Sequence, residues 1–386
     1  MRTVALVQAG GMGSRMRASG APAIKPLVSV RGVPLLERNV LALLRAGLRE
    51  LAVVVPAAAP ELRDFVLRRA RPLAEALGAT LELAIEATPR GTIGAASAWA
   101  GRADALLVVN ADNLAALDLP ALLRDHAASG AALTIAVHRE PFTIPWGVIE
   151  LAGRDVAAYR EKPSHEALIC SALSVLGPAA MAAIPRDHPC PLPALFETLR
   201  ARGDRIHAHL HAAPWIDVND ARDLERAEAL LARHVDAFER LTDAPALTVC
   251  GALLRHGDAL LLEQRAADAA SHPGLWDTPG GKVEPGEAPA AAMARELVEE
   301  LGLAGAAPIA LGSFDDVDVA RQRIVRHHAF ALDVEPAALR PTGSCFRWIE
   351  RSGLSQLQSL NGVVRRSLAL ERAAGATPPN LAPPTG

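Results

Sequence analysis

The chain of 386 residues is long enough for two or three domains of roughly 150 residues, each able to bury a hydrophobic core. Half of the residues are hydrophobic, yet no apolar run reaches the ~18 residues that a membrane-spanning helix needs. The net charge is −3 and no block of basic residues occurs, which argues against nucleic acid as a partner. We therefore expect a soluble globular protein whose partners are small molecules, with no membrane contact.

Cysteine spacing and the N-terminal residues indicate a cytoplasmic location. The four cysteines lie far apart without a C-x-x-C pair, so we expect reduced, structural thiols and no zinc site. The N-terminus has a short apolar run that ends at Gly10, and no signal-peptide cleavage pattern follows it. The sequence leaves oligomerisation open.

The first half of the chain alternates apolar strands with helical patterns. The expected elements, beginning with a strand and ending with two strands, lie at 4–7, 35–46, 51–55, 70–77, 81–85 and 106–109. This order predicts an α/β fold with a doubly wound, mostly parallel, Rossmann-like sheet. Ligands of such sheets bind beyond the carboxyl ends of the strands, where a glycine turn at 10–13 and Asp112 would lie.

The second half has a different texture. A charged helix is expected at 221–233, followed by short strands at 247–254 and 259–263 and one strong helix at 289–301, which predicts an α+β domain. The predicted division is a first domain at 1–234, a linker at 235–245, a second domain at 246–372 and a proline-rich disordered tail at 373–386.

The strongest motif lies in the second half. Residues 281–303 read GKVEPGEAPAAAMARELVEELGL and match, without a gap, the pattern G-x5-E-x7-R-E-U-x-E-E-x-G-U, where U is apolar. The spacing of Glu296, Glu299 and Glu300 places three carboxylates on one helical face, where they repel one another unless a cation lies between them. Oxygen ligands of this kind suit Mg²⁺ or Mn²⁺ beside a phosphate chain. The alternative, a solvated acidic helix face, accounts for neither the complete pattern nor its glycine loop.

This motif resembles the Nudix box, and the resemblance to Nudix hydrolases extends over about residues 246–365. It implies a Nudix fold that hydrolyses a nucleoside di- or triphosphate derivative. It further implies that Glu299 and Glu300 are metal ligands, that Glu296 is a ligand or the general base, and that Gly281 offers a carbonyl ligand. The lead-in Trp-Asp-Thr-Pro-Gly-Gly-Lys at 276–282 is most similar to the branch acting on (deoxy)nucleoside triphosphates. A further carboxylate for this site is left open among Asp315, Asp316, Asp318 and Glu335.

A glycine turn, QAGGMGSRM at 8–16, follows the first expected strand. Such a turn can bring backbone amides close to phosphate, and Arg15 adds positive charge. The turn fits neither a dinucleotide fingerprint nor a P-loop, and a plain strand-to-helix turn is its alternative. Only three of the 40 basic residues are lysine, Lys25, Lys162 and Lys282, and all three lie inside motifs.

Several further segments follow the turn in a characteristic order, namely IKPL at 24–27, RGVPLL at 31–36, EATPRGTIGA at 86–95, NAD at 110–112, WGVIE at 146–150, REKP at 160–163 and WIDVN at 215–219. In this order and spacing they resemble the sugar-1-phosphate nucleotidylyltransferases over about residues 1–232. That family transfers a nucleotidyl group from a nucleoside triphosphate to a sugar phosphate and releases pyrophosphate.

The resemblance implies a role for each matching residue. Asp112 and Asp217 would bind Mg²⁺, Arg15 and Lys25 would hold the triphosphate, and Lys162 would meet the sugar phosphate. The remaining substrate contacts are implied at Gly147 and Glu161 for the sugar, and for the nucleotide at Gly10, Gly11, Gly13, Ser14, Glu86, Gly91 and Thr92. Either aspartate taken alone could instead be a cap or turn residue.

Two departures from the family pattern leave the sugar and the base open. ICSAL at 169–173 stands where the family often has Asn-Ala-Gly, so the side chain of Ala172 can alter the sugar pocket. Ile24 precedes the first lysine, where proline is common.

The leading hypothesis is a fused, Mg²⁺-dependent enzyme with a nucleotidylyltransferase domain that makes an NDP-sugar or NDP-cyclitol and a Nudix hydrolase domain. Hydrolysis of the first domain's own product would be a futile cycle, so we expect a different nucleotide as the Nudix substrate. One alternative is a nucleotide sensor in which one domain binds its ligand without turnover and regulates the other. A third hypothesis is a Nudix hydrolase whose first domain is a scaffold.

Overall fold

The computed structural model describes residues 2–10, 24–269, 272–342, 345–357 and 359–375. It divides into two compact units. Unit 1 consists of Met1–Gly11, Ala46–Pro60 and Glu82–Asp217, and unit 2 of Met12–Arg45, Glu61–Leu81 and Val218–Gly386. Unit 2 thus includes two segments of the first half of the chain together with the whole second half.

The main structure of unit 1 is a seven-stranded sheet with the order β12-β8-β11-β6-β1-β4-β5. Its strands are β1 (Thr3–Gln8), β4 (Glu50–Pro56), β5 (Thr80–Glu86), β6 (Ala105–Asn110), β8 (Leu133–Thr143), β11 (Ser164–Leu176) and β12 (Ile206–His211). β1 pairs in parallel with β4 and β6, and β12 pairs in parallel with β8, whereas β11 runs antiparallel to both of its neighbours. The predicted α/β fold with a mostly parallel sheet is confirmed.

Short helices complete unit 1. They are η3 (Gly94–Trp99), α5 (Leu119–Ser129), α6 (Pro178–Ala183) and α7 (Leu192–Arg202). Leu6, Val54 and Leu106 from the sheet pack in one core with Trp99 and Met181 from two of these helices. β1 and β6 are apolar and buried along most of their length, as expected for central strands covered on both faces.

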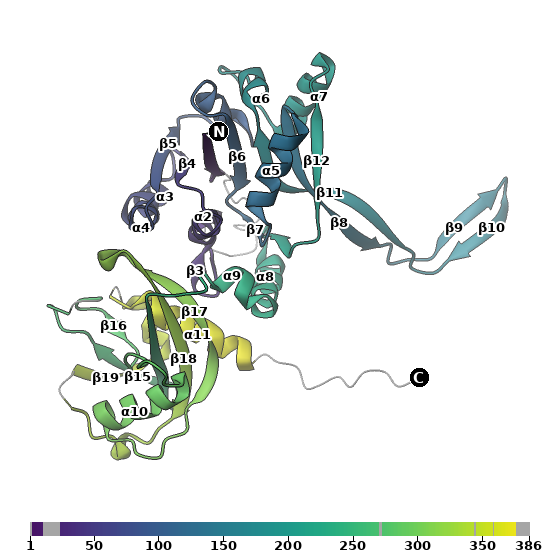
Figure 1. The fold of residues 1–386 in the computed structure, drawn as a ribbon. Coiled ribbons are helices and arrows are strands. Elements are labelled where there is room, and N and C mark those ends of the chain that lie inside the picture. The colour runs from purple at the N-terminus through teal and green to yellow at the C-terminus, as the bar shows by residue number, and fades with distance from the viewer. Residues whose placement is uncertain (1, 11–23, 270–271, 343–344, 358, 376–386) are drawn as a thin grey trace. The chain divides into compact units, whose positions relative to one another are not determined.

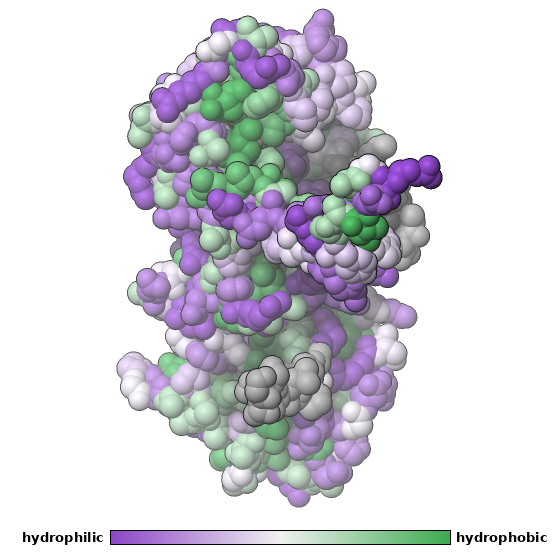
Figure 2. Space-filling view, turned by 90° about the vertical axis from the view of Figure 1, so that its right-hand side faces the viewer, coloured by the Kyte–Doolittle hydropathy of each residue, from purple (hydrophilic) through white to green (hydrophobic). Residues whose placement is uncertain are grey.

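A two-stranded hairpin, β9 (Val148–Ala152) and β10 (Asp155–Arg160), extends from the long strands β8 and β11 (Figure 1). The hairpin points toward the viewer in Figure 2, where hydrophobic and hydrophilic residues are mixed at its end. Leu151, Val156 and Tyr159 are each more than 60% exposed there. A second small ladder pairs β7 (Asn113–Ala115) with β13 (Trp215–Asp217).

Unit 2 contains elements from both halves of the sequence. Those before residue 244 are η1 (Lys25–Leu27), β2 (Ser29–Val30), β3 (Val33–Pro34), α2 (Leu35–Arg45), α3 (Pro60–Phe65), the π-helical stretch η2 (Val66–Ala70), α4 (Arg71–Ala76), α8 (Ala221–Arg233) and α9 (Val235–Glu239). The side chain of Asp220 caps α8 by accepting hydrogen bonds from the amides of Arg222 and Asp223. The stretch predicted as a linker, 235–245, therefore includes the helix α9, and its role as a domain boundary stays a prediction.

The second half folds around a six-stranded sheet with the order β16-β15-β14-β18-β17 and β19 paired to β15. Its strands are β14 (Leu247–His256), β15 (Ala259–Gln264), β16 (Trp276–Asp277), β17 (Ile309–Asp318), β18 (Arg323–Asp333) and β19 (Cys345–Glu350). The connecting 3-10 turns are η4 (Val319–Arg321), η5 (Pro336–Ala338) and η6 (Arg351–Gln356).

One helix covers each face of this sheet (Figure 1). Leu254 and Leu261 pack with Met293 and Leu297 of α10 (Pro289–Leu301). Leu253, Leu260 and Leu262 point the other way, as strand alternation requires, and pack with residues of α11 (Gly362–Gly375). α11 ends at Gly375, and the rest of the predicted disordered tail, 376–386, lies outside the described residues.

In the part of the chain that the structure describes, no helix combines the length and the apolar character needed to cross a membrane.

Candidate active sites

The two aspartates predicted to bind Mg²⁺ lie at one edge of the unit 1 sheet. β1 and β6 are parallel neighbours with Gln8 opposite Asn110, so the residues that follow both strands emerge at the same edge. Asp112 lies two residues after the end of β6. The antiparallel pairing of β13 with β7 places Asp217 opposite Asn113, the neighbour of Asp112. Two segments about a hundred residues apart in sequence thus bring both carboxylates to the carboxyl edge of the sheet.

A second group of predicted residues gathers around Gly10. A Cβ at Gly10 would lie 3.5 Å from Nε2 of Gln8 and 3.6 Å from Oε2 of Glu86. Gln8 Nε2 approaches the carbonyl oxygen of Gly91 at 3.5 Å. Oε1 of Gln8 and Oε1 of Glu86 are buried and have no hydrogen-bond partner among the described residues. Burial raises the pKa of Glu86, and hydrogen bonds from Arg90 and Gln8 oppose that effect.

Gly91 and Thr92 have visible roles in the backbone. Gly91 has a φ of +79°, and a Cβ there would lie 2.8 Å from the carbonyl group of Cys190, so this position requires glycine. The hydroxyl of Thr92 accepts a hydrogen bond of 3.1 Å from the amide of Leu192 at the start of α7. Both residues therefore anchor the loop 87–93 beside the Gln8 and Glu86 side chains.

Lys25 is buried in unit 2, and its Nζ donates a hydrogen bond of 2.9 Å to Oδ1 of Asn219. Each of these two residues belongs to one of the segments that carry the family resemblance. Gly11, Gly13, Ser14 and Arg15 lie outside the described residues, so their predicted roles stay predictions.

The predicted sugar contacts lie at the root of the β9–β10 hairpin. Gly147 immediately precedes β9, and Glu161 and Lys162 immediately follow β10. Tyr159 links the two sides, because a Cβ at Gly147 would lie 2.2 Å from its hydroxyl oxygen, and this hydroxyl donates a 2.7 Å hydrogen bond to Glu161. Lys162 adopts a positive φ of 43°. Glycine at 147 therefore allows the tyrosine to hold Glu161 at the hairpin root.

Sequence reasoning flagged the departure at 169–173 and missed the network around it. The main-chain oxygen of Ser171 accepts hydrogen bonds from Nδ2 of Asn113 at 2.7 Å and from Nε1 of Trp215 at 2.8 Å. Its hydroxyl lies 2.8 Å from His138 Nδ1 and 2.7 Å from His211 Nε2. These contacts tie β11 to the ladder that carries Asp217.

Ala172 has a φ of 57°, a left-handed conformation that glycine adopts most easily. The family resemblance implies a glycine at this position, and the conformation of Ala172 is one that suits glycine.

In unit 2 the glycine loop before α10 packs closely against its carboxylates. Gly280 has a φ of +146°, and a Cβ there would lie 2.2 Å from the carbonyl oxygen of Cys250. A Cβ at Gly281 would lie 2.3 Å from Oε1 of Glu296. The Gly281 carbonyl oxygen accepts a 2.9 Å hydrogen bond from the Cys250 amide, while the Gly280 amide donates to Oε2 of Glu300 at 3.1 Å. Both glycines are sterically required for the loop to approach the helix.

Arg295 organises the motif. Its guanidinium donates to Glu296 at 2.8 Å, to Glu299 at 3.3 Å, to both oxygens of Glu287 at 3.1 Å and to the carbonyl oxygen of Lys282 at 2.9 Å. Arg295 lies four residues before Glu299, a spacing that predicts it can orient a carboxylate of the loop-helix unit, and the structure shows it bridging the loop and the helix.

Glu300 turns toward a different partner, Glu263 on β15. Burial raises the pKa of Glu300 to about 7, and repulsion from Glu263 and Glu296 acts in the same direction. Glu263 is 6% exposed, its Oε2 has no hydrogen-bond partner among the described residues, and the nearest cation, Arg265, is 3.9 Å away. We call Glu263, Glu296, Glu299 and Glu300 the carboxylate cluster. A buried glutamate that ends an otherwise apolar strand was the sequence signal for Glu263.

The carboxylate cluster fits a divalent cation by its chemistry. Its donors are all hard oxygens, and one buried oxygen of Glu263 has no hydrogen-bond partner among the described residues. Burial raises the pKa of Glu300, and repulsion from Glu263 and Glu296 adds to that effect. The ligands are not preassembled, since no three acidic, histidine or cysteine side chains among the described residues converge as a metal site. Glu299 and Glu296 instead face Arg295, so a cation would have to draw them away from that guanidinium.

A cavity of about 420 Å³ opens on the glycine loop that packs against the cluster. Gly280, Gly281 and Lys282 of the glycine loop line it together with Asp316 and His327. Burial lowers the pKa of His327 to about 4, and its ring stacks on Phe314 with centroids 5.3 Å apart. Of the carboxylates left open by the sequence, Asp316 and Asp318 line this cavity.

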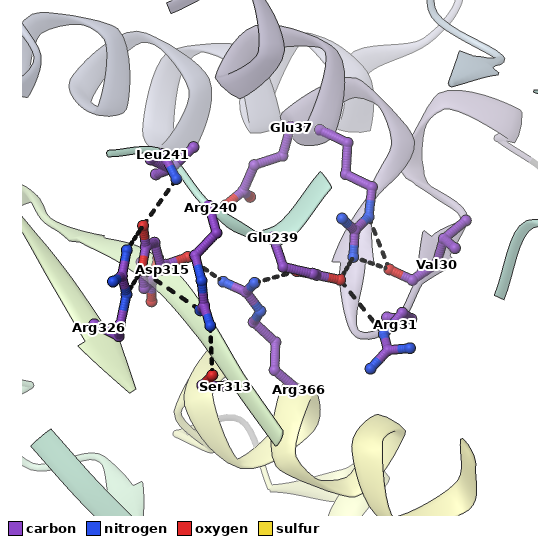
Figure 3. A network of polar contacts seen from close by, with 12 residues as sticks. Val30, Arg31, Glu37, Glu239, Arg240, Leu241, Ser313, Asp315, Arg326 and Arg366 are labelled. Atoms are coloured by element: carbon purple, nitrogen blue, oxygen red, sulfur yellow. Dashed lines mark hydrogen bonds and ion pairs between the residues drawn. The ribbon is translucent and has the colours of Figure 1, made fainter. Parts of the chain in front are cut away.

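Asp315 belongs to a different environment. It is fully buried, accepts hydrogen bonds from Arg326 at 2.8 and 3.1 Å, and receives the amide of Leu241 at 2.8 Å (Figure 3). Its neighbour in the same network, Glu239, is also buried and faces three arginines, Arg31, Arg38 and Arg366. We call these four residues, Glu239 and its three arginines, the arginine cluster.

The arginine cluster joins segments distant in sequence, namely the β2–β3 turn, α2, α9 and α11. Burial alone would raise the pKa of Glu239, but the three guanidinium groups outweigh it and hold that pKa at about 2. Main-chain oxygens complete the set, because Arg38 also donates to Val30 and Arg366 to Asp315.

Family models match both halves of the chain, and each belongs to a class of enzymes. A nucleotidyl transferase family model matches residues 4–232, and a NUDIX domain model matches residues 244–366. The chain belongs to the nucleotidyl transferase family and carries a NUDIX domain after it.

Relatives of each half are known. A mannose-1-phosphate guanylyltransferase of Mycobacterium tuberculosis is 28% identical over 240 residues, which covers 60% of this chain and 65% of that protein. A putative 8-oxo-dGTP diphosphatase 2 of the same species is 36% identical over 111 residues, or 28% of this chain and 75% of that protein. Among solved structures, HddC from Yersinia pseudotuberculosis complexed with GMP-PN covers 59% of this chain and 99% of its own, with 21% identity and a TM-score of 0.47.

Proposed function

We propose that the first domain transfers a nucleotidyl group from a nucleoside triphosphate to a sugar-1-phosphate or a cyclitol phosphate. The observation that carries this proposal is the β7–β13 pairing, which sets Asp217 opposite the neighbour of Asp112 at the edge where the glycine turn begins. Two carboxylates at that edge are a site for Mg²⁺ whose remaining ligands are phosphates and waters.

In this reaction a phosphate oxygen of the acceptor attacks the α-phosphorus, the bond between the α-phosphorus and its bridging oxygen breaks, and pyrophosphate leaves with the electron pair. Asp112 and Asp217 would hold the Mg²⁺, which when bound neutralises phosphate charge. Lys25 and Arg15 bind the triphosphate, and Lys162 binds the acceptor phosphate. Gly147 and Glu161, steadied by Tyr159, orient the sugar. Catalysis is then mainly positioning and charge neutralisation.

We further propose guanine as the base. The buried oxygens Oε1 of Gln8 and Oε1 of Glu86 are two acceptors without described partners beside Gly10 and Gly91. A buried acceptor costs free energy unless a donor reaches it, and guanine presents adjacent N–H donors on its ring and amino group. The similarity to a mannose-1-phosphate guanylyltransferase supports the same base.

The second domain, we propose, hydrolyses a nucleoside triphosphate of the guanine type in a Mg²⁺-dependent reaction. Water attacks a phosphorus of the triphosphate, a phosphoanhydride bond breaks, and the phosphate leaving group departs. Glu296, Glu299 and Glu300 would hold the cation, which when bound activates water and neutralises phosphate charge, and Glu263 adds a fourth carboxylate. Glu296 is proposed as a ligand or as the general base. The similarity to a putative 8-oxo-dGTP diphosphatase supports this substrate class.

The transferase test uses the double variant Glu299→Gln/Glu300→Gln, so that hydrolysis does not erase products. The variant is incubated with Mg²⁺, each of the four nucleoside triphosphates and a panel of sugar-1-phosphates, and pyrophosphate and NDP-sugars are followed by mass spectrometry. We expect one GDP-linked product, which disappears when Asp112→Asn is added. Nucleotide binding without product over the whole panel would instead support the sensor.

The hydrolase test uses Asp112→Asn, which leaves the second domain intact. We expect this variant to release a nucleoside monophosphate and pyrophosphate from a guanine nucleoside triphosphate in Mg²⁺ and to be silent in EDTA. If the wild-type chain degraded the first domain's NDP-sugar at the rate of its synthesis, the assignment of separate substrates to the two domains would be contradicted.

A further inference from the structure

One wall of the NUDIX cavity depends on a residue from the first half of the chain. Arg69 belongs to η2, inside the stretch that matches the nucleotidyl transferase family, and lies in unit 2. Its Nη2 is 3.5 Å from Oδ1 of Asp316, which lines the cavity. Nothing in the NUDIX sequence itself points to this contact.

Arg69 is fixed on its other side by Glu37 of α2. The Arg69 Nε donates to both oxygens of Glu37 at 3.1 Å, and Nη2 donates to Oε1 at 2.6 Å. Glu37 is 5% exposed and is therefore anchored in the core of unit 2. A guanidinium that donates to both oxygens of a carboxylate has a fixed orientation, so the positive charge beside Asp316 has a fixed position.

Only one of the two carboxylate oxygens of Asp316 has a hydrogen-bond partner among the described residues. Its Oδ1 accepts the Val317 amide at 2.8 Å and faces Arg69, whereas no hydrogen bond to Oδ2 is found within the described ranges. Burial raises the pKa of Asp316, but Arg69, Arg366 and His327 outweigh burial and lower it. The carboxylate is thus an ionised acceptor in the wall of a cavity.

The other two carboxylates of the cavity have partners of their own. Asp318 is held by Arg321 and Arg323 at 3.3 Å each. Asp277 accepts hydrogen bonds from Asn361 at 2.7 Å and from the Thr278 amide at 2.8 Å. Among the cavity's three carboxylates, Asp316 is therefore the one best placed to receive donors from a ligand.

We propose that Asp316 reads the base of the NUDIX substrate and that Arg69, supplied by the first domain's sequence, is its positioning residue. Resting on the hydrolase function proposed above, the inference identifies the substrate class as nucleotides whose base carries a ring N–H beside an exocyclic amino group. Oδ2 of Asp316 has two acceptor positions for these hydrogens, whereas Oδ1 is used by the Val317 amide and Arg69. A base lacking the amino group satisfies only one of the two contacts.

The test measures turnover and binding in the full chain, with dGTP and with dITP, whose base lacks the amino group. Because a hydrogen bond to a charged group is worth ~1.5–3 kcal/mol, we expect Asp316→Asn to raise KM for dGTP ~10-fold or more and to reduce the preference for dGTP over dITP. Arg69→Gln is expected to raise KM for dGTP ~10-fold with kcat within about twofold, and Arg69→Lys to recover part of the loss.

A matched control is Arg63→Gln, which breaks an exposed pair with Asp64 in the same segment, and we expect its KM to be unchanged. Thermal unfolding of each variant shows whether it is folded. If Arg69→Gln is not folded, the KM values of Arg69→Lys and Asp316→Asn are compared with that of the control instead. Equal KM values for Arg69→Gln and Arg63→Gln would overturn the proposed role of Arg69.

Calorimetric binding of dGTP to Glu299→Gln/Glu300→Gln, with and without Arg69→Gln, separates the two levels of the proposal. If the wild-type chain shows no turnover of dGTP, but Arg69→Gln weakens dGTP binding ~10-fold, the hydrolase function is rejected and the base-reading role is kept. Turnover by the wild-type chain with binding unaffected by Arg69→Gln would keep the hydrolase and reject the role of Arg69. No binding of dGTP would reject both.

Discussion

The arginine cluster and the carboxylate cluster of unit 2 have opposite charge balances. In the arginine cluster one buried carboxylate, Glu239, faces three guanidinium groups, and main-chain oxygens accept their remaining hydrogen bonds. In the carboxylate cluster Arg295 pairs with Glu296 and Glu299, while the nearest cation to Glu263, Arg265, is 3.9 Å away and one buried oxygen has no described partner. Burial and repulsion from the neighbouring glutamates raise the pKa of Glu300 to about 7.

This difference separates charges that build structure from charges that await a ligand. A buried ion pair whose groups are all satisfied needs nothing further, and removal of one partner leaves uncompensated charge. A cluster with excess negative charge is destabilised until a cation binds. The predictions below remove one charged group at a time, and the two clusters should respond with opposite signs.

The largest expected effect is in the arginine cluster. Glu239→Gln leaves three buried guanidinium groups without their carboxylate and should lower the free energy of unfolding by ~3–5 kcal/mol. Chemical denaturation checks this. Glu197→Gln, which breaks an exposed pair with Arg200, is the control and should change stability by less than ~0.5 kcal/mol. Equal, small effects of both variants would show that Glu239 is not structural.

Acid should weaken the same cluster. The pKa of Glu239 is about 2 in the folded chain against an ordinary 4.5, so its contribution is fully present above about pH 4.5 and is lost as the pH falls toward 2. A shift of this size corresponds to ~3 kcal/mol. Unfolding curves of wild type and Glu239→Gln between pH 2 and 6 should converge at low pH. Parallel curves across that range would contradict the assignment.

In the carboxylate cluster the effect should appear in catalysis rather than in folding. Glu296→Gln should reduce hydrolysis of the nucleoside triphosphate by ~100-fold or more, because it removes a charged oxygen from the proposed cation site. The control is Glu284→Gln, an exposed position of the same loop that the motif leaves variable. Transferase activity measured on the same preparations should be unchanged in both variants.

The sequence predicted the elements that repeat a local pattern. Strand and helix positions in the first half, the helix at 289–301 and the change of texture after residue 245 all follow from periodicity. The Nudix glutamates were visible because a helix brings residues three and four apart onto one face. The family resemblance implied that Asp112 and Asp217 bind Mg²⁺, and the β7–β13 ladder places Asp217 opposite the neighbour of Asp112.

Contacts between segments distant in sequence could not be predicted, because they leave no local pattern in the sequence. Glu239 lies in a stretch predicted as a linker, yet three arginines from 31 to 366 surround it. Arg69 and Asp316 are 247 residues apart, and neither belongs to a motif. The compact units follow tertiary packing, which a one-dimensional pattern does not contain, and the predicted domain boundaries stay predictions.

The most direct test of the contrast between the clusters is the unfolding temperature of wild type and Glu263→Gln, measured in EDTA and again in Mg²⁺. Because Glu263 repels Glu300, its removal should raise the unfolding temperature of the metal-free chain and should shrink the stabilisation that Mg²⁺ confers. If Glu263→Gln lowers the unfolding temperature in EDTA and responds to Mg²⁺ like wild type, the carboxylate cluster is not a cation site.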